Sequence, residues 1–128
     1  VVAAFAIDST NFKINCLVHD TASVRLTDII TIVVSKTDNF NLLKDKAKEK
    51  SFLLQNVFQE GIVISRKDPN YHPQKNEDLI KTYNSDVLDS TWMVVDDPTE
   101  LIVNNIPKFL REEHTHFIIT VDRSRVEL

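Results

Sequence analysis

Two histidines near the end of the chain, His114 and His116, have the spacing of a metal-binding pair. Residues two apart on a β-strand point to the same face, and imidazole is a common zinc ligand. Two ligands are too few for a site, and the two glutamates before them fall in a predicted loop. We therefore expect strand residues that bind no metal, and we interpret His19 and His72 as isolated loop residues.

Cys16, the only cysteine, would be a nucleophile only if a base lay against its thiol. It alternates with Phe12 and Ile14, which instead indicates a buried position in a strand. A single cysteine also excludes an intrachain disulfide and a cysteine-rich zinc site.

The acidic stretch at residues 96–100 (DDPTE) offers the start of an acidic pair or of a metal site. More simply, Asp97 caps a helix that has Pro98 at its first position. Because Gly61 is the only glycine, a glycine-rich phosphate-binding loop is excluded. No nucleophile elbow or Ser-His-Asp order stands out either. We predict no catalytic residue, no metal and no cofactor.

The length and composition are those of one small domain. The chain has 128 residues, of which 42% are hydrophobic and 27% charged, and a formal net charge of −4. That charge argues against nonspecific nucleic-acid binding, and no apolar run is long enough for a membrane span. We expect a domain over residues 11–123, an N-terminal extension or edge segment over 1–10 and a C-terminal tail over 124–128.

Alternating apolar residues predict a strand at 12–20 (FKINCLVHD), and β-branched residues predict a second at 24–36 (VRLTDIITIVVSK). The short turn between them indicates a hairpin. Further strands are predicted at 62–67 (IVISRK) and at 116–124 (HFIITVDRS). The short apolar run at 91–97 (TWMVVDD) is either a strand or a buried turn.

A helix is predicted after the hairpin, with Asp38 or Asn39 as its N-cap. Its apolar stripe covers the sheet and its lysines point to solvent, where their charge is largely dispensable for folding. The stripe consists of Phe40, Leu43 and Ala47, and the basic face, a candidate interaction surface, of Lys44, Lys46, Lys48 and Lys50.

Residues 52–60 (FLLQNVFQE) either extend this helix or form a second turn that packs Phe52, Leu53, Val57 and Phe58 inward, with Gly61 as a helix stop. The loop at 68–77 contains Tyr71, an aromatic residue that we add to the candidate interaction surface.

These elements predict an α+β chain in the order of the ubiquitin-like β-grasp fold: a mixed sheet, one main helix packed across it and extra short helices. The last strand then runs beside the first. We expect one core, consisting of Phe12, Ile14, Cys16, Val18, Ile30, Ile32, Val34, Leu43, Ala47, Ile118 and Val121.

In this order the chain resembles the N-terminal header of Crinkler effector proteins. The resemblance rests on four stretches: FKINCLVHD (12–20), LLKDKAKEK (42–50), IVISRKD (62–68) and HTHFIITV (114–121). The family's translocation motif reads Leu, any residue, Leu, Phe, Leu, Ala, Lys. In the matching window, 61–67, Val63, Ile64 and Lys67 are comparable, whereas Ser65 and Arg66 depart from it.

The resemblance implies a non-enzymatic ubiquitin-like module of a secreted effector, delivered into a host cell, with the nucleus as one destination there, and binding a host protein. Homo-oligomerisation is left open. One alternative is a structural or oligomerising ubiquitin-like domain of an intracellular protein. Another is a small enzyme with a metal on His114 and His116.

Overall fold

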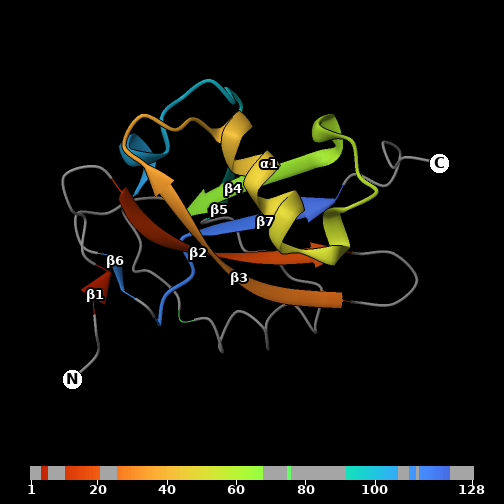
Figure 1. Ribbon diagram of the computed structural model, residues 1–128, viewed down its shortest axis with the longest axis horizontal. Coiled ribbons are helices and arrows are strands. Elements are labelled where there is room, and N and C mark those ends of the chain that lie inside the picture. The colour runs from red at the N-terminus through yellow and green to blue at the C-terminus, as the bar shows by residue number, and fades with distance from the viewer. Residues whose placement is uncertain are drawn as a thin grey trace.

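A computed structural model describes residues 4–5, 11–20, 26–67, 75, 92–106, 110–111 and 113–121. Its main sheet has five strands in the order β3-β2-β7-β4-β5. Their bounds are β2 Asn11–Asp20, β3 Leu26–Ser35, β4 Ile62–Lys67, β5 Trp92–Val94 and β7 Phe117–Val121. Helix α1 (Phe40–Lys50) lies across one face of this sheet (Figure 1).

The pairing of the strands is mixed. Strands β2 and β3 form the predicted antiparallel hairpin, while β7 runs parallel to β2 and antiparallel to β4. Short 3-10 helices lie at Phe52–Leu54 (η1), Gln59–Gly61 (η2) and Ile102–Asn105 (η3). A separate small sheet pairs β1 (Ala4–Phe5) with β6 (Leu110–Arg111). The predicted α+β class is confirmed: the main sheet has the β-grasp strand order, and its last strand, β7, lies beside its first, β2.

The N-terminus of α1 is satisfied partly by a distant segment. Asn39 is the N-cap, and its side chain accepts a hydrogen bond from the Leu42 N–H at 3.0 Å. The N–H groups of Phe40 and Asn41 donate to the backbone oxygens of Glu100 and Pro98. The first turn of a helix leaves free N–H groups, so the turn at residues 98–100 supplies acceptors to the start of α1.

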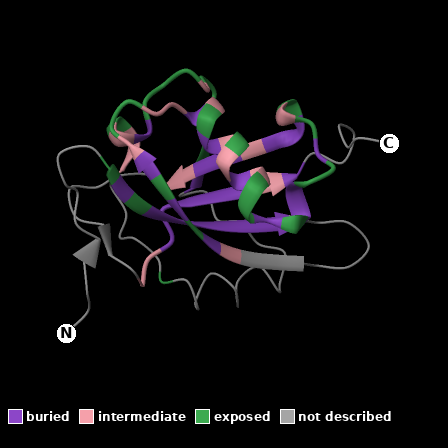
Figure 2. Ribbon diagram, viewed as in Figure 1, coloured by how far each residue is buried: buried purple, intermediate pink, exposed green. Residues whose placement is uncertain are grey.

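The apolar stripe of α1 packs on the sheet as predicted. Phe40, Leu43 and Ala47 are buried, and the Phe40 ring meets Phe117 edge-on, with 5.4 Å between ring centroids. Figure 2 shows that α1 has both buried and exposed residues and that the sheet beneath it is largely buried. Every predicted core residue belongs to this core except Ile118.

Ile118 packs on the opposite face of the sheet, with Leu17 and Trp92. Its strand neighbours Phe117 and Ile119 face α1. Because side chains alternate along a strand, Ile118 cannot share a face with Val121, three residues away. The prediction for Ile118 was therefore wrong, and the sheet is buried on both faces at this point.

The segment after α1 also differs from the expectation. Of the four residues predicted to pack inward, Leu53 and Val57 are buried, whereas Phe52 and Phe58 are 67% and 48% exposed. The helix ends before them, and short 3-10 turns change which side chains point inward. Gly61 closes the second of these turns and is not the stop of α1.

His19 was predicted in a loop, but it lies in β2 and is buried. Asp97 accepts hydrogen bonds from the N–H and hydroxyl of Thr99, so it stabilises a turn and not a helix start. Tyr71, His72 and the predicted tail lie outside the described residues.

Candidate interaction surface

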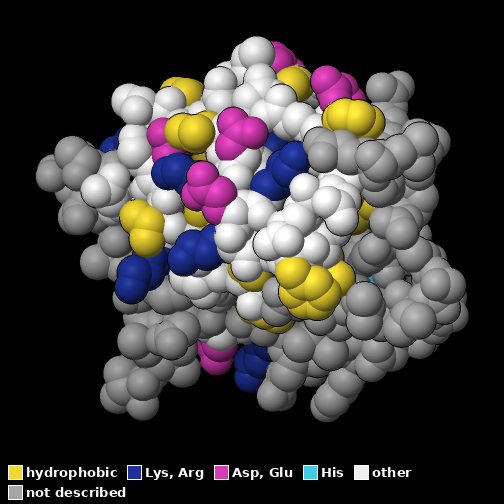
Figure 3. Space-filling view, turned by 45° about the vertical axis from the view of Figure 1, so that its right-hand side comes forward, with side chains coloured by type: hydrophobic (Ala, Val, Ile, Leu, Met, Phe, Trp, Pro, Cys, Tyr) yellow, Lys and Arg dark blue, Asp and Glu magenta, His cyan; other side chains and the backbone are white. Residues whose placement is uncertain are grey.

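The four lysines of α1 lie on two flanks of the helix. Successive helical residues are rotated by about 100°, so residues four apart share a flank. Lys46 and Lys50 lie toward β3, whereas Lys44 and Lys48 lie toward β4. Asp45 and Glu49 lie between the flanks. Figure 3 accordingly shows acidic and basic side chains intermixed on this face, without one continuous basic strip.

Lys46 hydrogen-bonds to the outer edge of β3 near the C-terminal end of the strand. Its Nζ donates to the backbone oxygen of Val33 at 2.9 Å and to Asp38 Oδ2 at 3.0 Å. The same Asp38 oxygen accepts the Ser35 N–H at 2.8 Å. We call these bonds the Lys46–Asp38 clip. The sequence predicted that Lys46 is solvated, but its ammonium group is hydrogen-bonded to Val33 and Asp38.

Two hydrogen bonds between Asn15 and His116, the residue just before β7, show which way the backbone groups of β2 point. The Asn15 backbone N–H donates to Nδ1 of His116 at 2.8 Å, and the His116 backbone N–H donates to the backbone oxygen of Asn15 at 2.9 Å. Both backbone groups of Asn15 therefore face β7. They consequently point away from β3.

In an antiparallel pair, hydrogen-bonded and non-hydrogen-bonded residue pairs alternate. Asn15 lies opposite Thr31, and because its backbone groups face β7, this is a non-hydrogen-bonded pair. The pairs two residues away, which contain Ile29 and Val33, are of the same kind. These three residues of β3 therefore direct their N–H and C=O groups away from β2. Because β3 is an edge of the sheet, the groups point out of it.

Among the residues that the structure describes, this outer edge has no neighbouring strand beyond the clip. No described residue hydrogen-bonds to the outward groups of Ile29 or Thr31. Thr31 is exposed, and Val33 is 50% exposed. An open row of backbone donors and acceptors is a template for pairing with another strand.

A polar network lies on the sheet face opposite α1. The Thr31 hydroxyl donates to Asn15 Oδ1 at 2.8 Å, and Asn15 Nδ2 donates to the backbone oxygen of His114 at 3.0 Å. Burial, assisted by the nearby His114, lowers the pKa of His116 to about 4. His116 is therefore neutral at pH 7, and its Nδ1 is a hydrogen-bond acceptor.

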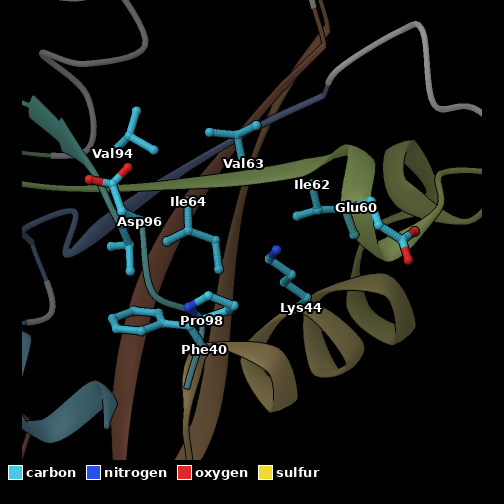
Figure 4. A pocket seen from close by; sticks show the side chains of 10 residues that line it. Phe40, Lys44, Glu60, Ile62, Val63, Ile64, Val94, Asp96 and Pro98 are labelled. Carbon is cyan, nitrogen blue, oxygen red and sulfur yellow. The ribbon is translucent and has the colours of Figure 1, made fainter. Parts of the chain in front are cut away.

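The Lys44 flank borders a hollow of about 240 Å³ between α1, β4 and residues 94–98. Lys44 extends over Ile62 and Ile64, with Glu60 and Asp96 on opposite sides (Figure 4). Partial burial lowers the pKa of the Lys44 ammonium, and the negative charge of Glu60 opposes this shift. The hollow combines an apolar floor with one partly desolvated cation.

The motif-like residues of the resemblance lie in β4, between β7 and β5. Ile64 is buried in the core, Val63 is half-buried, and the Lys67 ammonium lies 5.3 Å from the centre of the Trp92 ring. In the folded domain these residues form part of an interior strand. Cys16 is buried in the same core, and burial raises the pKa of its thiol.

Sequence reasoning missed the open edge and the clip. The hairpin alone does not say which of its strands has a second neighbour. The expected position of the last strand beside the first was the available signal, because it makes β2 interior and leaves β3 at the edge.

Among the described residues, no group of three His, Cys, Asp or Glu side chains is arranged to hold a metal. None of the helices described is long and apolar enough to cross a membrane. Comparisons with protein-family models, curated proteins and solved structures found no match to this chain.

Proposed function

We propose that this chain is a non-enzymatic β-grasp module that binds a protein partner through the outer edge of β3. In line with its resemblance to the Crinkler header, we further propose that it belongs to a secreted effector and binds a host protein after delivery. The observation that carries the binding role is the open edge at Ile29 and Thr31, next to exposed Val33.

Three features support a binding role for this edge. The strand is ten residues long, which is longer than the mean strand and gives ample length for pairing. The clip stabilises its C-terminal end in an extended form. The polar network behind it fixes Thr31 through Asn15. A rigid edge binds an extended segment with a smaller entropic cost than a mobile one.

The alternative function, a structural or oligomerising domain, uses the same edge differently. Two copies would pair β3 with β3, as unprotected edge strands can do. Light scattering after size-exclusion chromatography separates the two: a monomer at micromolar concentration supports the partner-binding role, and a dimer supports the alternative.

The test of the proposed function uses two substitutions at one position. Val33→Pro removes an outward N–H that β2 does not use, and proline is tolerated on edge strands. Val33→Thr keeps the N–H and the β-branched shape. Immobilised wild-type chain and Val33→Thr should retain the same identified proteins from host-cell extract, and Val33→Pro should lose them. Equal retention by all three would contradict binding through this edge.

A further inference from the structure

Resting on that proposed function, we propose that the β3 edge binds an extended, acidic segment of the partner, which adds to the sheet as another strand beside β3. The argument uses the hydrogen-bonding groups left open, the lysines around them and the limit that the clip sets.

The backbone defines where the segment pairs. Ile29 and Thr31 each offer an N–H and a C=O, and Val33 offers its N–H, because its C=O is bound by Lys46. An added strand forms bonds at every second residue. The available edge is therefore about five residues long, or roughly 17 Å, and it ends at the Lys46–Asp38 clip.

Positive charge surrounds this edge on both faces. On the α1 side, Lys46 lies at the edge with its charge paired with Asp38, and exposed Lys50 is one helical turn further along the same flank. On the opposite face, exposed Lys13 lies directly across from Val33 in the β2–β3 register. Exposed Lys36 directly follows β3, next to Ser35 of the clip.

The carboxylates of the clip and of the outward side of α1 leave this charge only partly balanced. Asp38 is occupied by Lys46 and the Ser35 N–H, and Glu49 lies on the outward side of α1. The side chains of an added strand alternate between the two faces. Glutamates on either face of the segment would therefore meet a lysine, while the exposed methyl groups of Val33 favour a β-branched neighbour.

The experiment uses three seven-residue synthetic peptides, capped at both ends, that alternate Thr or Val with Glu, with Gln or with Lys. Binding to the full chain is followed by NMR shifts of the Thr31 and Val33 amides. At low salt the Glu peptide should bind at least tenfold more tightly than the Gln peptide. This advantage should shrink at 0.5 M salt, because exposed charges are screened.

A second arm tests strand addition without altering the protein. Two Glu peptides carry N-methyl groups on alternate sets of residues. In an added strand, one set of N–H groups faces β3 and the other faces solvent. One methylated peptide should lose binding and the other should keep it. If the two behave alike, whether both bind or both fail, strand addition is overturned.

The α1 flanks supply matched protein variants. Lys50→Gln should weaken binding of the Glu peptide by roughly two- to fivefold, and Lys48→Gln, on the other flank, should leave it unchanged. Equal effects of the two variants would overturn the assignment of the acidic segment to this edge.

The outcomes separate this inference from the function on which it rests. If the Gln and Glu peptides bind equally, the acidic preference is wrong and binding at the edge stands. If no peptide shifts Thr31 and Val33, strand addition is wrong, whereas host-protein binding is decided by the retention experiment with Val33→Thr and Val33→Pro.

Discussion

Asn15 and His116 exchange two hydrogen bonds, one from each backbone N–H: the Asn15 N–H to the His116 ring at 2.8 Å, and the His116 N–H to the Asn15 oxygen at 2.9 Å. The imidazole thereby replaces a backbone acceptor at the start of the β2–β7 ladder. The same pair turns the backbone of Asn15 toward β7, and this orientation leaves Thr31 facing out of the sheet.

This pairing predicts a loss of stability in mild acid. The pKa of His116 is lowered from 6.5 to about 4, by burial and then by His114. Between these values the unfolded chain binds a proton that the native chain does not, so the stabilisation is complete above about pH 6.5 and falls as the pH decreases toward 4. The loss from this residue is at most roughly 3 kcal/mol. Urea denaturation across this pH range measures it.

His116→Asn is the control for that prediction, because the asparagine side chain has an oxygen that can accept the Asn15 N–H and has no titratable group. The variant should show a shallower dependence of stability on pH. NMR titration of the His116 ring gives a direct check. A native pKa near 6.5, or an unchanged slope in the variant, would contradict the account.

The two flanks of α1 should respond differently to loss of charge. Lys46→Met removes the bonds to Val33 and Asp38 and should lower the free energy of unfolding by about 1 kcal/mol. Lys44→Met removes a partly buried charge for which the desolvation cost outweighs the attraction of Glu60, so stability should stay constant or rise. Denaturation of both variants decides this, and the reverse order would refute the assignment of the flanks.

The helix stripe provides a packing test. Leu43 is fully buried between α1 and the sheet, so Leu43→Ala should cost about 2–5 kcal/mol. Its neighbour Leu42 is 38% exposed, so Leu42→Ala should cost far less, about 0.5 kcal/mol. Similar costs at both positions would mean that the helix is rotated from the orientation described.

Cys16 should be chemically inert in the native domain. Its thiol is buried and burial raises its pKa, so the reactive thiolate is scarce. A thiol reagent at neutral pH should label it slowly in buffer and rapidly in urea. Rapid labelling of the native protein would return Cys16 to the candidate nucleophiles.

The features predicted correctly from the sequence depend on local periodicity. Alternation in residues 12–18 identifies the inner face of β2, and the spacing of Phe40, Leu43 and Ala47 identifies the buried stripe of α1. The same rule shows why Ile118 was misassigned, since residues 118 and 121 have opposite parity on a strand. Periodicity did not predict the exposure of Phe52, because 3-10 turns interrupt the helical pattern there.

The interaction surface was less predictable because it depends on contacts between distant residues. Whether Lys46 is solvated or bonded depends on where α1 crosses β3, and this crossing sets its distance to Val33. Which groups of Thr31 are open depends on Asn15 and His116, residues about a hundred positions apart in the chain. The basic character of α1 was recognised, but its division between two flanks follows from which residues the sheet covers.

Hydrogen exchange of the β3 amides, read residue by residue by NMR, tests the central claim most directly. In the free protein, the N–H groups of Thr31 and Val33 should exchange rapidly, and those of Ile30 and Ile32, which face β2, should exchange slowly. Addition of the Glu peptide should slow exchange at Thr31 and Val33. Slow exchange at all four amides of the free protein, or fast exchange at Thr31 and Val33 with saturating peptide, would contradict the open edge as a strand-binding surface.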